Sequence, residues 1–295
     1  MTAYRFCRTD DIGLLVDALN RCWAPHFPEE PAMTPAVFKR SIRDLQVWCS
    51  SCMVALSGEE PVAVLIGAKR PSGTLVHRIA VHPDHCRRGH ARHLLDSLAS
   101  KLAILGPPRI VAEVPASLGP ARGLFAAGGY VPEAVLTDYV LQPPDAGAGP
   151  PAAPGTFDIP ITPDDLAANG LAADDGRPGC WHRAAETLAA RKGEVFGRAV
   201  ASEERIEAWI LYTKPPAAGP YPAEPPGAEV LSLGTVVEDG AAGLRRLLAG
   251  VSAEGGGMVR FSRVHPAEAP AGLLEALRFR PAGAHVLYSG TARAH

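Results

Sequence analysis

The spacing of apolar residues in the first half of the chain alternates between strand-like runs and helical periodicity. In chain order it predicts strands at 4–8, 51–58, 61–70, 75–81, 109–115 and 134–142, with helices opening at Thr9, Thr34 and Gly89 and a short helix before the last strand. The order βααβββαβαβ mixes a hairpin with helical crossovers. It predicts an α/β fold with a mixed sheet.

The second half of the chain repeats part of this pattern. The segment GLLEALRFRP, which starts at Gly272, matches GLFAAGGYVP, which starts at Gly123. Upstream, the run 230–236 overlays 75–81, and Leu247 and Leu248 overlay Leu94 and Leu95 with a connecting loop two residues shorter. We interpret the chain as an internal duplication.

Length and composition agree with two globular domains. The chain has 295 residues, of which 47% are hydrophobic and 20% charged, and single cores rarely grow beyond about 250 to 300 residues. The charge-free segment AGAGPPAAPG (146–155) separates predicted domains at 1–145 and 156–295, while the proline-rich stretch 215–227 is interpreted as a loop of the second.

Charge and cysteine usage exclude several classes of function. A net charge of −2 argues against nucleic acid as a partner, and no apolar run is long enough for a membrane span, so we expect a cytoplasmic protein. Cys49 and Cys52 form C-x-x-C without a second pair, so we expect packing cysteines rather than a zinc or redox site. His82, His85, His90 and His93 lack suitable carboxylate partners, and we expect no metal.

The stretch HPDHCRRGHARHLL (82–95) links a strand to an amphipathic helix and carries the most specific chemistry of the chain. The first amides of such a helix have no partner within the helix, and its dipole attracts anions. The guanidinium groups of Arg87, Arg88 and Arg92 add positive charge suited to a pyrophosphate. Neither a P-loop nor G-x-G-x-x-G is present, so ATP and dinucleotides are not the expected ligands.

These residues resemble the GNAT family of N-acetyltransferases, whose signature is a strand, V-x-P, and then R/Q-x-x-G-x-G/A opening a helix. Here the match is Val81-His82-Pro83 followed by Cys86 to Ala91, with Cys86 in place of the usual Arg or Gln. The duplication makes the chain similar to tandem GNAT proteins. The resemblance implies acetyl-coenzyme A as cofactor, bound at the pantetheine by Ile79, Ala80 and Val81, and at the phosphates by Cys86, Arg87, Arg88, Gly89, His90, Ala91 and Arg92.

The resemblance also implies the reaction: acetyl transfer to a primary amine of a small molecule or protein by direct attack. His77, in the strand beside the expected thioester, is the candidate general base, with a strand histidine satisfied by a neighbour as the alternative. Family members often place a tyrosine proton donor where this chain has Phe125. Water, Tyr130 or Tyr139 would then protonate the thiolate.

Several alternatives stay open at this stage. Glu29 and Glu30, in the loop 23–31, would either attract a cationic acceptor or form a solvated acidic loop. Trp181 and His182 are interpreted as packing residues. The second-copy loop 237–243 contains Glu238 and Asp239, which oppose a diphosphate, so we expect coenzyme binding in the first domain alone. A non-catalytic acyl-coenzyme A sensor or scaffold is the rival function, and we expect a monomer or homodimer.

Overall fold

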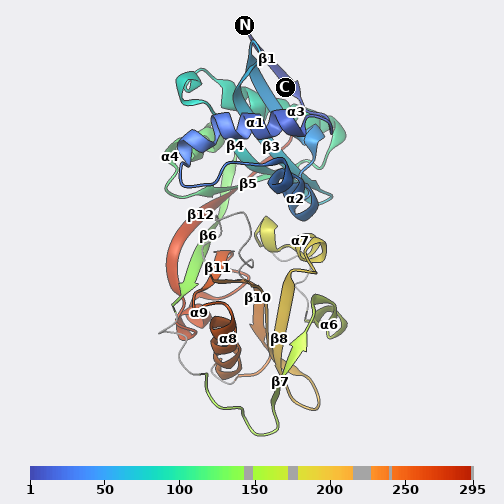
Figure 1. The fold of residues 1–295 in the computed structure, drawn as a ribbon, viewed down its shortest axis with the longest axis vertical. Helices are drawn as coiled ribbons and strands as arrows, with labels where there is room; N and C mark the ends of the chain where they lie inside the picture. Colours follow the sequence, from blue (N-terminus) through green and yellow to red (C-terminus); the bar gives the residue numbers. More distant parts are fainter. Residues whose placement is uncertain (143–148, 172–178, 215–226, 239–240, 294–295) are drawn as a thin grey trace. The chain divides into compact units, whose positions relative to one another are not determined.

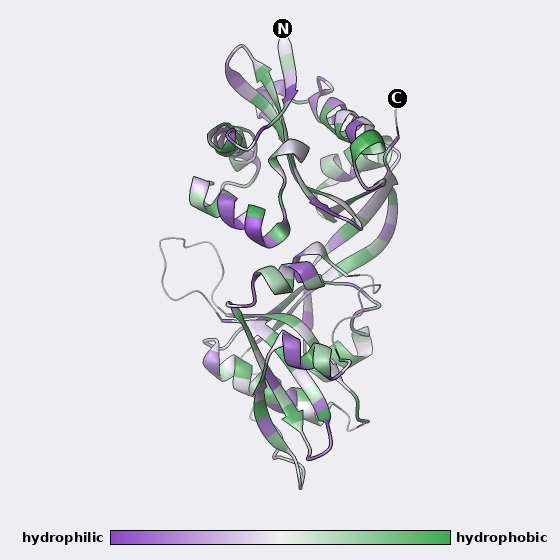
Figure 2. Ribbon diagram, turned by 90° about the vertical axis from the view of Figure 1, so that its right-hand side faces the viewer, coloured by the Kyte–Doolittle hydropathy of each residue, from purple (hydrophilic) through white to green (hydrophobic). Residues whose placement is uncertain are grey.

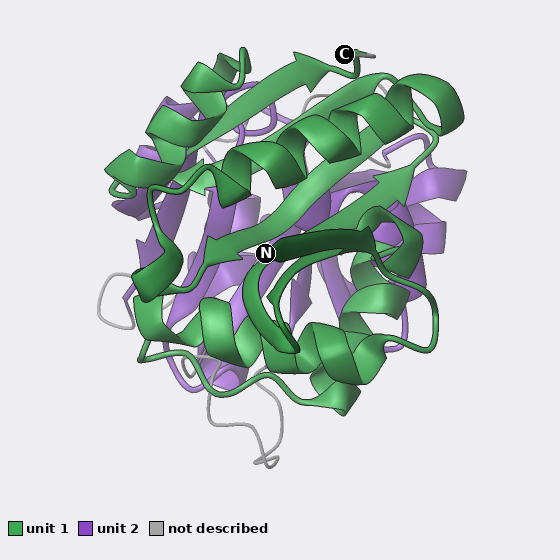
Figure 3. Ribbon diagram, turned by 90° about the horizontal axis from the view of Figure 1, so that it is seen from above, with its two compact units in different colours: residues 1–134, 286–295 green, residues 135–285 purple. Residues whose placement is uncertain are grey.

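The structure is a computed structural model that describes residues 1–142, 149–171, 179–214, 227–238 and 241–293. The chain forms two compact units (Figure 3). Unit 1 comprises residues 1–134 together with 286–295, and unit 2 comprises residues 135–285. Parts of the two proline-rich stretches, residues 146–148 and 215–226, lie outside the described residues, as do Asp239 and Gly240.

Unit 1 has the predicted βααβββαβαβ order and the mixed α/β architecture, which confirms the predicted fold class (Figure 1). Its elements are β1 (Thr2–Phe6), α1 (Ile12–Cys22), η1 (Ala24–His26), α2 (Pro35–Leu45), η2 (Cys49–Ser51), β2 (Met53–Ser57), β3 (Glu60–Arg70), β4 (Gly73–Val81), η3 (Pro83–His85), α3 (His90–Leu105), β5 (Arg109–Pro115), α4 (Gly119–Ala127) and the start of β6 (Val131–Leu141).

Helices cover both faces of the unit 1 sheet. The buried leucines of α3 pack with Ala63 and Leu65 of β3 in one core cluster. Val64 and Ile66 are also buried but point to the opposite face, because side chains alternate along a strand, and there α1 contacts β3. The helices show alternating hydrophobic and hydrophilic bands (Figure 2), as expected of elements with one face on a sheet.

Strand β4 has two irregularities that shape the unit. It runs antiparallel to β3, but the register skips one residue between Val76 and Arg78, so His77 bulges out of the ladder. On its other side, β4 pairs with the parallel strand β5 only at Thr74 and Leu75. Beyond Leu75 the two strands part, and a gap opens between them towards the end of β4.

Unit 2 repeats this plan. After the rest of β6 it contains β7 (Phe157–Ile161), α6 (Pro163–Ala168), η4 (Trp181–Arg183), α7 (Ala185–Ala190), β8 (Val195–Ala201), β9 (Ile206–Thr213), β10 (Ala228–Thr235), α8 (Ala242–Glu254), β11 (Val259–Val264), α9 (Ala271–Ala276) and the start of β12 (Arg280–Thr291). Its strand order is β6-β11-β10-β9-β8-β7, and the leucines of α8 fill the main core.

The duplication is visible in the pairing of the strands. Strand β10 pairs in parallel with β11 at Ala228 and Glu229 only, and its register with β9 skips Leu231. Ala228 therefore corresponds to Thr74, and Leu231 to His77. The sequence overlay of 230–236 on 75–81 is wrong by one residue, because repeated apolar residues in neighbouring positions do not reveal which of them occupies the bulge.

Two strands cross the boundary between the units. Residues 135–141 of β6 belong to unit 2, whereas residues 286–291 of β12 belong to unit 1, where β12 follows β5 in the sheet. Val286 and Tyr288 join the core cluster of α3 and β5. The end of the chain is therefore part of the core of unit 1.

None of the described helices is both long and apolar enough to cross a membrane.

We predict that truncation after His285 destabilises unit 1, although the deleted segment is distant in sequence. The truncated chain loses the buried side chains of Val286, Leu287 and Tyr288, each worth about 1.5 to 3 kcal/mol of burial, and exposes the edge of β5. Hydrogen exchange should show faster exchange in β5 and α4. Removal of only the last two residues is the control, and unchanged protection in the longer truncation would contradict the assignment of β12 to this core.

Candidate functional site

The loop from β4 to α3 is held by short-range hydrogen bonds among its own residues. Cys86 N–H donates to Pro83 O at 3.1 Å, and the Asp84 amide donates to His82 Nδ1 at 3.3 Å. The Arg88 guanidinium donates to Asp84 O at 2.9 Å. These short-range bonds curl the chain back on itself before α3 begins, and Cys86, Arg87 and Arg88 lie exposed on the loop.

The amino terminus of α3 forms a concave set of backbone donors. The first helical hydrogen bond runs from His93 N–H to Gly89 O, so the helix supplies no i−4 partner for the amides of residues 90–92. Gly89 and Arg87 both adopt positive φ angles, 85° and 62°. Left-handed residues among successive amides turn their N–H groups towards one point, an arrangement that binds anions. A Cβ on Gly89 would meet no atom within 4 Å, so the space before the loop is open.

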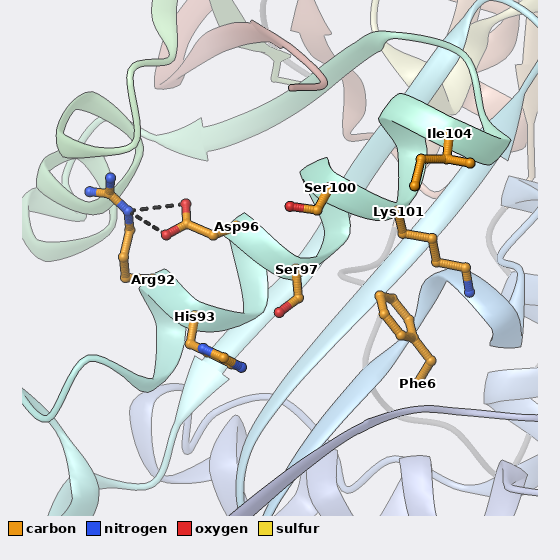
Figure 4. Close-up of a pocket in the computed structure, with 8 residues that line it drawn as sticks. All are labelled: Phe6, Arg92, His93, Asp96, Ser97, Ser100, Lys101 and Ile104. Carbon is orange, nitrogen blue, oxygen red and sulfur yellow. Dashed lines mark hydrogen bonds and ion pairs between the residues drawn. The ribbon is translucent and has the colours of Figure 1, made fainter. Parts of the chain in front are cut away.

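The three arginines of this stretch have different positions. Arg87 and Arg88 are exposed at the loop. Arg92 instead donates to the Asp96 carboxylate at 2.9 Å and 3.1 Å (Figure 4). Its Nη1 also donates to Ala127 O, at the end of α4, at 2.6 Å. In this structure the Arg92 guanidinium fastens α3 to α4, and its backbone amide remains among the helix-end donors.

Histidines surround the base of the loop. His90 is buried, and its Nδ1 lies 2.7 Å from the Tyr4 hydroxyl, while the His93 ring lies 3.9 Å from the Tyr4 ring. The His85 ring lies 6.2 Å from that of His90. Among the described residues no three His, Cys, Asp or Glu side chains are arranged to hold a metal ion.

The register of β3 and β4 decides which backbone groups of β4 face the strand gap. The His82 amide donates to Val62 O, so His82 and Val62 form a hydrogen-bonded pair. Pairs alternate along an antiparallel ladder. Ala80 consequently bonds β3, whereas the N–H and C=O groups of Ile79 and Val81 point away from β3 into the gap where β5 has parted.

His77 occupies the bulge beside this gap. Its side chain is half-buried, and no residue of β3 stands opposite it. A bulge redirects a side chain out of the regular alternation. The structure thus places His77 two residues before Ile79, on the same strand as the exposed backbone groups.

The two candidate tyrosines lie in different units. Tyr130 belongs to unit 1, and its ring packs edge-on against Phe125 at 5.3 Å; burial raises its pKa to about 12. Tyr139 pairs with Phe261 and packs against the unit 2 core. Sequence reasoning missed Tyr288, whose ring stacks on Phe125 at 5.8 Å. Tyr288 lies near the end of the chain, and no local pattern connects it with Phe125.

The loop after α1 is docked on β4. The Arg78 guanidinium lies over the Trp23 ring at 4.6 Å and pairs with the Glu30 carboxylate at 3.1 Å, and the Trp23 indole donates to the same carboxylate at 3.1 Å. Glu30 is therefore paired with a neighbouring cation, while its side chain remains 40% exposed. Glu29 is exposed.

A hollow of about 610 Å³ runs along α3 (Figure 4). It is lined by Phe6 of β1 and by Arg92, His93, Asp96, Ser97, Ser100, Lys101 and Ile104 of α3. The Lys101 ammonium lies 4.0 Å from the centre of the Phe6 ring. Neither His77 nor the backbone of Ile79 and Val81 lines this hollow, so it is distinct from the strand gap.

The corresponding gap in unit 2 contains side chains. The Glu229 carboxylate accepts from Ser262 N–H at 3.0 Å and lies 3.6 Å from the Arg260 guanidinium. Arg183, with a side chain 4% exposed, donates to the carbonyls of Ser262 and Arg263 and pairs with Glu268 at 2.5 Å. The equivalent of Glu229 in unit 1 is Leu75, which has no polar group to place there.

The family comparison agrees with this geometry. The model of the acetyltransferase (GNAT) family matches residues 14–130, nearly all of the first segment of unit 1. Unit 1 is a GNAT acetyltransferase domain. The loop between β4 and α3 and the parting of β4 from β5, both described above, lie within the residues that match the family model. A search of curated proteins finds no match to the chain.

Solved structures extend the likeness to both units. A tandem GNAT protein from the clavulanic acid biosynthesis pathway is 18% identical over 99% of each chain, with a TM-score of 0.68. A GCN5-related N-acetyltransferase from Sphaerobacter thermophilus is 15% identical over 99% of this chain and 96% of the other, also with a TM-score of 0.68. A putative acetyltransferase from Pyrococcus horikoshii reaches 0.58 at 16% identity over 99% and 90%. At these identities the likeness shows that the whole chain has the tandem GNAT fold.

We predict that His90 makes the GNAT domain less stable in acid. Burial, followed by the charges of His85, Arg88 and His93, lowers the pKa of His90 below its usual 6.5. The unfolded chain therefore binds a proton at a higher pH than the folded chain, and stability falls as pH drops from 6.5 towards the lowered pKa. Above that range both states are neutral and the effect vanishes.

His90→Gln should reduce the fall of Tm between pH 7.5 and 5.5, measured by circular dichroism. Ser100→Ala, on the same helix, should retain the pH dependence of the unmodified protein. An identical slope in His90→Gln would contradict the assigned origin of the acid sensitivity.

Proposed function

We propose that the GNAT domain transfers an acetyl group from acetyl-coenzyme A to a primary amine of a small molecule or protein. The GNAT fold supports acyl transfer from an acyl-coenzyme A in general. One observation carries the proposal. The loop before α3, which has the features of an anion-binding loop, lies next to two residues of β4, Ile79 and Val81, whose backbone groups face the strand gap.

The chain offers groups that fit both ends of such a coenzyme. The amides at the start of α3, with Arg87 and Arg88, suit its diphosphate. The N–H and C=O groups of Ile79 and Val81 suit the amides of its pantetheine arm, which would lie in the gap as an extra strand. Acetyl-coenzyme A, when bound, would supply the activated thioester that reacts with the amine.

His77 is the proposed general base. An alkyl ammonium has a pKa near 10, so the attacking amine must lose a proton before or during attack. The bulge positions the His77 imidazole on the strand that would hold the arm, where it can accept that proton directly or through a water. The amine nitrogen then forms the new bond to the acyl carbon, and the sulfur leaves as a thiolate.

The thiolate needs no strongly acidic partner, because a thiol is a good leaving group near neutral pH. Phe125 cannot donate a proton, and the aromatic rings of Tyr130 and Tyr288 pack against its ring. Water, Tyr130 or Tyr288 is the proposed proton source. Unit 2 serves as a structural half, since Arg183 and Glu229 already occupy its strand gap.

A non-catalytic acyl-coenzyme A sensor is the second candidate, favoured by the buried phenylalanine at position 125. Release of thiol from acetyl-coenzyme A, monitored across a panel of primary amines, separates the two. Turnover with any amine supports the enzyme, whereas coenzyme binding without turnover across the panel supports the sensor.

The double variant Arg87→Ala with Arg88→Ala should raise the coenzyme KM by about 10- to 100-fold, because two charge-assisted contacts to phosphate are lost at an exposed site. Arg122→Ala, an exposed arginine on α4, is the matched control and should leave KM unchanged. Steady-state kinetics at saturating acceptor provide the measurement, and an unchanged KM in the double variant would refute the loop assignment.

His77→Ala should lower kcat by about 100-fold, the usual contribution of a general base, and flatten the acidic limb of the pH profile of kcat. His77→Gln keeps a polar side chain without basicity and should behave like the alanine variant. If either variant retains the profile of the unmodified enzyme, His77 is not the base.

A further inference from the structure

The imidazole of His26 lies in the strand gap of unit 1. His26 ends η1, in the loop between α1 and α2, and its Nε2 lies 2.8 Å from Val81 O. A carbonyl oxygen can only accept, so Nε2 carries the proton and donates. The His26 side chain is otherwise exposed, and the contact joins two segments that are distant in the sequence.

This carbonyl is one of the backbone groups that face the gap. The register turns Val81 away from β3, and β5 has already parted from β4 six residues earlier at Leu75. A buried or half-buried carbonyl needs a donor. In the structure His26 is the nitrogen donor that it has, and the Cys86 thiol at 3.7 Å is a weak second.

We propose that His26 is a displaceable occupant of the pantetheine position, a proposal that rests on the proposed function. An arm lying in the gap would donate its amide N–H to Val81 O, the same acceptor that His26 uses. The arm would need the space beside Val81 O that the His26 imidazole occupies, so coenzyme binding would move the imidazole aside and break this one contact between the loop 23–31 and β4.

The other contacts of the loop make this movement local. Trp23 and Glu30 both hold Arg78, and neither uses the backbone of Ile79 or Val81. These contacts can persist while His26 swings out. The loop thus has a fixed attachment at Arg78 and one exchangeable contact at Val81.

Unit 2 contains the fixed version of the same arrangement. Its corresponding loop repeats the Cys-Trp pair of Cys22 and Trp23 as Cys180 and Trp181. It sends Arg183 onto the carbonyls of Ser262 and Arg263, at the parting of β10 and β11. Arg183 is almost fully buried and paired with Glu268, whereas His26 is exposed and makes a single hydrogen bond. Among the described residues, the exposed single contact is in the gap of unit 1, and the buried, paired arginine is in the gap of unit 2.

Isothermal titration calorimetry of the full chain tests the proposal with two ligands. Coenzyme A has the arm, whereas adenosine 3′-phosphate 5′-diphosphate has the phosphates alone. His26→Ala should bind coenzyme A about three- to tenfold more tightly, the worth of one net hydrogen bond, because no protein donor has to be displaced. Its affinity for the armless ligand should not change.

Two further variants and one measurement without substitution complete the test. His26→Gln retains a donor and should resemble the unmodified protein, and Lys39→Ala, an exposed position on α2, controls for unspecific effects. In the unmodified protein, hydrogen exchange in residues 23–31 should accelerate with coenzyme A but not with the armless ligand. This last experiment does not depend on the folding of any variant.

Failure of this proposal is distinguishable from failure of the proposed function. If neither ligand binds the unmodified protein, the coenzyme site itself is wrong. If both bind, but His26→Ala leaves coenzyme A affinity unchanged or lower and the loop shows no faster exchange, the displacement by the arm is refuted while the coenzyme site stands.

Discussion

The parting of β4 from β5 is the constraint on which the candidate site depends. Parallel pairing stops after Thr74 and Leu75, and the bulge at His77 follows at once. From there the backbone of β4 has one satisfied edge, against β3, and one edge with donors and acceptors still to be matched. Because unmatched backbone groups are costly, a strand that ends in this way must have them covered by solvent, side chains or a ligand.

The two units meet this requirement differently. In unit 2, side chains of the same unit satisfy the backbone groups at the gap. The Glu229 carboxylate accepts a hydrogen bond from an amide of β11, and the buried Arg183 guanidinium donates to two carbonyls of that strand. Such a buried, paired cation is difficult to move, because breaking it leaves Glu268 and the carbonyls without their partner. Unit 1 has Leu75 in place of Glu229 and a single exposed imidazole in place of the arginine. Duplication of one fold has produced an open gap and a closed gap from the same geometry.

The loop before α3 indicates which kind of ligand the open gap of unit 1 would accept. Its amides, its left-handed Arg87 and Gly89, and two exposed guanidinium groups together form an anion-attracting loop next to β4. Diphosphate binding at this end would align an attached arm with Val81 and Ile79, and so bring a thioester towards His77. Strand β12, which passes from unit 2 into unit 1, places Tyr288 beside Phe125. The core of unit 1 therefore includes residues that follow unit 2 in the sequence.

Much of this was already determined by the sequence. Periodicity located the strands and helices of unit 1, the match of GLLEALRFRP to GLFAAGGYVP revealed the duplication, and the run 82–95 predicted an anion-binding loop, because each signal lies within short stretches of sequence. The tertiary structure alone decided which residue bulges from β4, which carbonyls face the gap, that His26 and Arg183 reach those gaps, and that β12 enters unit 1. These are pairings between distant segments, set by strand register and packing, and no spacing along the chain encodes them.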